Sequence, residues 1–172
     1  MQILRNIEDA IDSSFVSGVE YHGFGSGDLE TFVTEEGTNL MTGNIYTRFC
    51  LQAGFMYSEP NHPFIKHCLK TLYDFGNRAF INEDGSDNSF VIDLSMMIEL
   101  KNRYGIIYRD KDQKLDDDIK IWNSTVFATK KSRTKNSYLI HWFDQSWKTD
   151  GGIFMKMKIY IKKYLYFIYR KL

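Results

Sequence analysis

The segment at residues 138–148 (YLIHWFDQSWK) gathers three side chains that can do chemistry. His141, Ser146 and Trp147 lie within seven positions of one another. An imidazole is a common metal ligand, a hydroxyl can donate or accept a hydrogen bond, and an indole N–H is a pure donor. The segment could close a substrate site, or it could cap a core strand and pack its tryptophans inside. These residues alone leave both interpretations open.

Acidic residues occur at three further places where chemistry is conceivable. Glu20 ends the small, apolar stretch FVSGVE, and Asp84 and Asp87 lie with Asn88 in the turn-rich INEDGSDNS. That loop has only a faint likeness to a calcium loop, because it lacks the full ligand series and the glutamate at its twelfth position. Asp116–Asp118 contains a literal Asp-x-Asp, but three acids directly before the strand-like IKIW predict a solvated turn.

Composition and charge narrow the class of protein. The chain has 172 residues, 43% apolar and 26% charged, which are ordinary values for one soluble domain with a sizeable core. Residues 1–152 carry 16 basic and 22 acidic side chains, and all later charges are basic. An acidic body argues against a nucleic-acid partner, which would need a broad basic face.

Cysteine usage and hydropathy indicate the compartment. Cys50 and Cys68 lie far apart without CxxC spacing, so we expect reduced, buried thiols in a reducing compartment. The N-terminal MQILRNIEDAI has no apolar signal core. No apolar run reaches the roughly 18 residues that a membrane-spanning helix needs. We therefore expect a cytoplasmic protein.

The periodicity of the apolar residues predicts helices that alternate with short strands. MQIL reads as the end of a strand, SSFVSGVEY as a short buried strand, and IYTRFCLQAGFMYSE as one strand or as two joined at Ala53–Gly54. A helix is expected from Pro63, capped by Asn61 or His62, and a second helix from FVID to a stop near Tyr104–Gly105. GIIYR, IKIW, TVFAT and YLIHWF read as strands, with KDQKLDDD as a turn. This order predicts an α/β or α+β domain.

Residues 1 to about 150 resemble, in order, a known family of enzymes. The segments that carry the likeness are ILRNIEDAI, FVSGVE, AGF followed by PNHPFIKHCL, FINEDGS, RYG, DDDIKIW and IHWFDQSW. They are similar to the C-terminal half of the bacterial capsular-polysaccharide glycosyltransferases related to yeast initiation mannosyltransferases, the family with the DXD sugar-binding region. The resemblance implies an incomplete GT-A-like α/β fold over residues 1–150, without the N-terminal nucleotide-binding half. In that family the missing half ends in an Asp-x-Asp strand, and Met1 would follow its second aspartate.

The resemblance gives the histidine segment a role at the donor site. In the similar enzymes the corresponding segment folds over a nucleotide sugar whose diphosphate is bridged by a divalent metal. By this likeness His141 would contact the Mn²⁺ or Mg²⁺ or the diphosphate, and Ser146 and Trp147 would donate hydrogen bonds to phosphate oxygens. Many relatives have His-His where this chain has His141-Trp142. The metal itself would require the Asp-x-Asp motif of the missing half, and Asp116–Asp118 is not its replacement.

The acceptor side is implied in the same way. The INEDGSDNS loop would line it, so Asp84, Asp87 and Asn88 could bind sugar hydroxyls, and one of the aspartates could serve as the catalytic base. Glu20 would face the sugars from the end of its strand, or it is only a strand-end charge. The pair usually found at the start of the following helix is replaced here by Val91-Ile92-Asp93.

Residues 151–172 form a separate basic tail. A helix through GIFMKMKIYIKKYLYFIYRKL would carry one apolar stripe made of Phe154, Met157, Ile161, Leu165, Ile168 and Leu172. Its basic residues and its lack of acids are typical of a helix that lies on an anionic membrane surface, and the alternative is that the stripe packs on the body. We expect peripheral attachment to the inner face of the cell membrane.

These observations predict a glycosyltransferase, present as a fragment or short form. It would transfer a hexose from a nucleotide sugar to a growing surface polysaccharide or glycolipid, a reaction that needs charge neutralisation on the leaving diphosphate. The alternatives are a catalytically inactive binding module at the membrane surface and a truncated remnant. Retained affinity for the donor would separate these possibilities.

Overall fold

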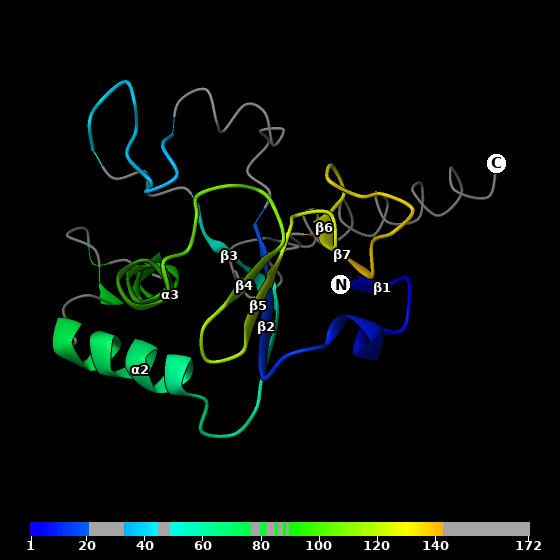
Figure 1. The fold of residues 1–172 in the computed structure, drawn as a ribbon, viewed down its shortest axis with the longest axis horizontal. Coiled ribbons are helices and arrows are strands. Elements are labelled where there is room, and N and C mark those ends of the chain that lie inside the picture. Colours follow the sequence, from blue (N-terminus) through cyan, green and yellow to red (C-terminus); the bar gives the residue numbers. More distant parts are fainter. Residues whose placement is uncertain are drawn as a thin grey trace. The chain divides into compact units, whose positions relative to one another are not determined.

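A computed structural model describes residues 1–20, 33–44, 49–76, 80–81, 85, 88 and 90–142. The chain divides into two compact units, Met1–His141 and Trp142–Leu172. The described residues of the first unit form a mixed α/β structure with two sheets and two α-helices (Figure 1). The expected amphipathic tail lies outside the described residues.

The larger sheet has four strands in the order β3-β2-β5-β4. These are β3 (Leu51–Ser58), β2 (Phe15–Val19), β5 (Ile119–Trp122) and β4 (Gln113–Leu115). β2 and β5 run parallel, and the two outer strands run antiparallel to their neighbours. All five residues of β2 are buried, as expected for a central strand that is covered on both faces.

A second sheet of three short strands covers one face of the larger sheet. It has the order β1-β7-β6, from β1 (Gln2–Ile3), β7 (Leu139–His141) and β6 (Phe127–Thr129). Phe127 stacks on Phe55 of β3 with ring centroids 4.2 Å apart. The buried amide of Gln52 donates to the Phe127 carbonyl at 2.6 Å, which ties β3 to β6 through a polar bond as well.

Two helices cover the opposite face of the larger sheet, α2 (Pro63–Phe75) and α3 (Phe90–Tyr104) (Figure 1). A short 3₁₀ helix, η1 (Ile7–Ala10), follows β1. The core beneath α2 and α3 is apolar and includes Phe15, Phe64, Leu100, Ile119 and Ile121. Gly105, with φ +63°, follows α3 as predicted.

His62 is the residue that caps α2. Its Nδ1 accepts the backbone N–H of Phe64 at 3.2 Å, and Pro63 occupies the first helical position. The predicted helix is therefore confirmed, with His62 rather than Asn61 as the cap. The apolar stripe of α2 is wider than its buried face, since Leu69 and Tyr73 are 48% and 82% exposed.

The strand predictions are wrong around residues 105–115. GIIYR is not a strand, because the side chain of Gln113 takes the place of a neighbouring strand. Its Oε1 accepts the Ile107 N–H at 2.8 Å and its Nε2 donates to the Ile107 carbonyl at 2.9 Å. The strand is instead β4, inside the segment expected as a turn, and the turn shrinks to Asp116–Asp118. Asp117 and Asp118 have φ of 55°, a conformation that aspartate tolerates.

β3 is a single strand that passes through Ala53–Gly54, one of the two expected alternatives. Its register against β2 is irregular there, because Met56 pairs with Ser17 but Leu51 pairs with Val19. Four residues of β3 (52–55) thus lie opposite the single residue Gly18 of β2, and this bulge brings Gly54 against the His141 ring of β7.

Candidate functional site

The parallel strands β2 and β5 end side by side at one end of the larger sheet. Glu20 is the first residue after β2. β3 runs the other way, so the residue before it, Cys50, lies beside Glu20, and the Glu20 N–H donates to the Cys50 carbonyl at 2.8 Å. In open α/β sheets ligands bind outside the carboxyl ends of the parallel strands. Glu20 therefore lies where a ligand is expected.

At this end of the sheet the carboxyl groups of Glu20 and Asp93 and the thiol of Cys50 form an electrostatic cluster. Burial, and then the charge of Asp93 in the first turn of α3, raise the pKa of Glu20. Burial also raises the pKa of Asp93. The Cys50 thiol donates to Glu20 Oε2 at 3.7 Å, and burial together with both carboxylates raises its pKa.

This cluster has a definite chemical capability. Two half-buried carboxyls that repel one another retain a proton at higher pH than exposed ones do. Such a group can accept and return a proton, and its oxygens can bind sugar hydroxyls. The thiol stays protonated and acts as a donor to Glu20, so it is not a nucleophile.

His141 lies at the end of β7, against the bulge of β3. A Cβ on Gly54 would lie 2.8 Å from Cγ of the His141 ring and 2.9 Å from its Nδ1. Only glycine at position 54 lets the ring approach β3 so closely. His141 thus has a fixed place against β3 of the larger sheet, in a contact distinct from the Glu20 cluster. Ser146 and Trp147 lie outside the described residues.

The acceptor-side residues are described only in part. Asn88 is half-buried, and its backbone N–H donates to the Phe80 carbonyl at 2.8 Å. Asp84 and Asp87 lie outside the described residues, so their predicted role stays a prediction.

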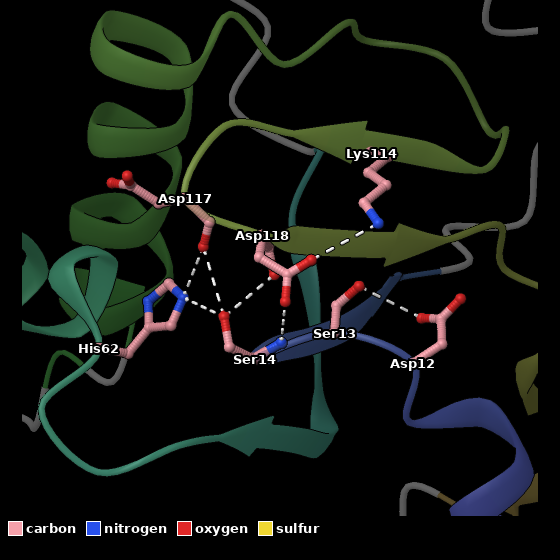
Figure 2. Close-up of polar contacts among 7 residues, drawn as sticks. All are labelled: Asp12, Ser13, Ser14, His62, Lys114, Asp117 and Asp118. Atoms are coloured by element: carbon pink, nitrogen blue, oxygen red, sulfur yellow. Dashed lines mark hydrogen bonds and ion pairs between the residues drawn. The ribbon is translucent and has the colours of Figure 1, made fainter.

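Figure 2 shows a second polar cluster, at the start of β2 and the β4–β5 turn. Since His62 Nδ1 accepts a backbone N–H, its proton is on Nε2, which lies 3.0 Å from the Asp117 carbonyl and 3.2 Å from Ser14 Oγ. An Nε2 that carries a proton cannot take one from Ser14, so this Ser–His pair is not an activated nucleophile. It joins α2 to the sheet.

The literal Asp-x-Asp belongs to this structural cluster. Asp118 accepts the Ser14 N–H at 2.8 Å, and Asp117 accepts the Tyr104 hydroxyl at 2.9 Å. Both precede β5, so they lie at the opposite end of the parallel pair from Glu20. The prediction of a turn here is confirmed.

Asp93 and Cys50 are the site residues that sequence reasoning did not assign. Cys50 was expected as a buried, reduced thiol, and both cysteines are indeed free and buried. Asp93 was noted only as a departure from the family pattern. The available signal was an acid in the first turn of an apolar helix, FVIDLSMM.

No three His, Cys, Asp or Glu side chains among the described residues lie together in a way that could hold a metal ion. Within the same residues, no helix is long and apolar enough to cross a membrane. No protein-family model matches the chain, and no curated protein and no solved structure is detectably similar to it.

Proposed function

We propose that this chain is part of a glycosyltransferase that transfers a hexose from a nucleotide sugar to a growing surface polysaccharide or glycolipid. The observation that carries the proposal is the carboxyl pair of Glu20 and Asp93 at the carboxyl end of β2. It supports the interpretation of Glu20 as a residue that faces the sugars, over that of a strand-end charge, and it adds a second acid from α3. The resemblance supplies the reaction class, and the carboxyl pair supports a sugar-binding role at this end of β2.

The carboxyl pair would act on the sugars. Carboxylate oxygens accept hydrogen bonds from the several hydroxyls of a hexose. With its raised pKa, Glu20 or Asp93 could also hold the proton that leaves the attacking hydroxyl. Asn88, together with Asp84 and Asp87, would extend the acceptor side.

His141, with Ser146 and Trp147, would close the donor side. The contact of the His141 ring with Gly54 supports this arrangement, because it fixes the start of the segment against β3. Imidazole, hydroxyl and indole donors suit a leaving diphosphate, on which negative charge develops.

The order β3-β2-β5, with one antiparallel strand beside a parallel pair, is compatible with the proposed GT-A-like fold. In the similar enzymes a nucleotide-binding half supplies the Asp-x-Asp that would hold Mn²⁺ or Mg²⁺. The described residues do not form a metal site by themselves, so the proposed steps assign no action to the metal.

The tail at residues 153–172 would hold the enzyme on the cytoplasmic face of an anionic membrane, near a lipid-linked acceptor. It carries six basic residues and no acid. Vesicles of phosphatidylcholine with phosphatidylserine should therefore bind the chain, and vesicles of phosphatidylcholine alone should bind it weakly. Equal binding to both would remove the electrostatic argument.

Thermal-shift titration with UDP-sugars and GDP-sugars, with and without Mn²⁺, tests the activity class. We expect one nucleotide sugar to raise the melting temperature of the wild type and of Asp74→Asn, but not of Asp93→Asn or His141→Ala. Asp74 is a suitable control because its carboxylate is exposed on α2, in an ion pair with Lys70. A flat response in the wild type would overturn the proposal, and vesicle binding without nucleotide-sugar binding would favour the inactive membrane module.

A further inference from the structure

The outer edge of β3 is open among the described residues. β3 is the first strand of the larger sheet, and in the part of the chain that the structure describes it pairs only with β2. An open strand edge presents unpaired N–H and C=O groups in a row, and it readily accepts another strand.

The hydrogen-bond pattern identifies which groups point outward. The Glu59 N–H donates to the Ser14 carbonyl at 2.8 Å, so this opposed pair is a hydrogen-bonded one. Hydrogen-bonded and non-hydrogen-bonded pairs alternate along an antiparallel ladder. Val16 and Tyr57 therefore also form a hydrogen-bonded pair, and the N–H and C=O of the intervening Met56 point away from β2.

Apart from the bulge at Gly54, β3 lacks the features that usually protect an edge. Its eight residues, LQAGFMYS, include no charge and no proline, and Met56 is 42% exposed. The opposite edge of the sheet is guarded, since β4 has only three residues and carries the exposed Lys114. Short edges and lysines prevent strand addition, so the contrast indicates that the edge of β3 is normally covered.

We propose that a second copy of this chain covers it, through antiparallel pairing of β3 with β3 about a twofold axis at Met56. Met56 then faces Met56 of the second copy, and Phe55 faces Tyr57 on both sides of the axis. Aromatic pairs directly opposite one another stabilise antiparallel strands. No like charges meet, because β3 has none, and an isologous contact of this kind closes as a dimer.

The outward direction of the Met56 N–H gives a sharp test, using sedimentation velocity on the full chain. The wild type and Met56→Ala should be dimers, because both keep the N–H. Met56→Pro should be a monomer that retains its fold, since proline is tolerated on an edge strand where the N–H faces solvent. Circular dichroism checks the fold of each variant.

Charge variants test the register and do not depend on how the proline variant folds. Met56→Lys and Met56→Glu should each be monomeric, because each places like charges opposite one another across the axis. An equimolar mixture should dimerise again. A monomeric wild type, a larger aggregate insensitive to position 56, or a mixture that stays monomeric would overturn the inference. Nucleotide-sugar binding is not needed for any of these outcomes, so the proposed function can fail separately.

Discussion

His62 connects three elements through one imidazole ring, and replacing it tests how α2 is held on the sheet. The side chain is 4% exposed. It caps α2 through Phe64, bonds the β4–β5 turn through the Asp117 carbonyl, and packs on Phe15 with ring centroids 5.7 Å apart.

Each connection has a typical magnitude. A helix cap contributes about 1 kcal/mol to the free energy of unfolding. A hydrogen bond such as that of His62 Nε2 contributes about 1 kcal/mol, and an aromatic contact such as that with Phe15 contributes about 1 kcal/mol. His62→Ala removes all three and should lower the free energy of unfolding by about 3 kcal/mol. His62→Asn restores only the cap, since asparagine is a good cap residue but too short to reach Asp117, so it should recover about 1 kcal/mol of that loss.

Urea unfolding followed by circular dichroism measures both variants. The urea dependence of the unfolding free energy should stay constant, because neither variant changes the surface exposed on unfolding. A loss below about 1 kcal/mol for His62→Ala would refute the connecting role, since it would fall near the range of ordinary surface substitutions. Equal losses in the alanine and asparagine variants would refute the capping role.

Three further results are expected at other positions. Because the folded-state pKa of Glu20 is raised, its stabilising contribution is complete below the ordinary value of 4.5 and is lost as pH rises through the folded-state pKa. Glu20→Gln should therefore lose less stability than the wild type as the pH rises above 4.5, and parallel pH profiles would contradict this. Gly54→Ala should cost about 1–3 kcal/mol in urea unfolding by pressing on the His141 ring, and a neutral result would remove that contact. Burial raises the pKa of the Cys50 thiol and raises that of Cys68 to about 12. Iodoacetamide should therefore label both thiols slowly in the folded protein and readily in urea. Fast labelling of the folded chain would contradict their burial.

Local signals predicted the helices well. The order His62-Pro63 and the glycine at position 105 specify where α2 begins and α3 ends, because caps and stops act within one or two residues of the helix. The buried strand β2 was also recognisable within SSFVSGVEY, since a strand covered on both faces reads as a small and apolar run.

Side-chain contacts with the backbone explain the errors. GIIYR has the composition of a strand, but the Gln113 side chain occupies its backbone groups, and no local pattern reveals such a substitution. Tyr108 in the same segment packs against Gly37, where a Cβ would lie 2.7 Å from the tyrosine ring. The true strand, β4, was hidden because its alternation covers only three residues.

In the candidate site, too, one residue could be predicted from the sequence and another could not. Glu20 was identifiable from its position after an apolar strand. Asp93 was not, because its proximity to Glu20 depends on how α3 packs at the end of β2, more than seventy residues away in the sequence. A carboxyl pair assembled from distant elements has no spacing that a single sequence can show.

The central claim is that sugars bind at the carboxyl end of β2. Nuclear magnetic resonance tests it most directly, by following backbone amide shifts in the ¹⁵N-labelled chain as UDP-sugars and GDP-sugars are added. The account predicts that the amides of Glu20, Cys50 and Asp93 shift with a common saturation curve, while those of Ser14 and His62, at the other end of β2, stay in place. Shifts confined to Ser14 and His62, or no saturable shift with any nucleotide sugar, would contradict it.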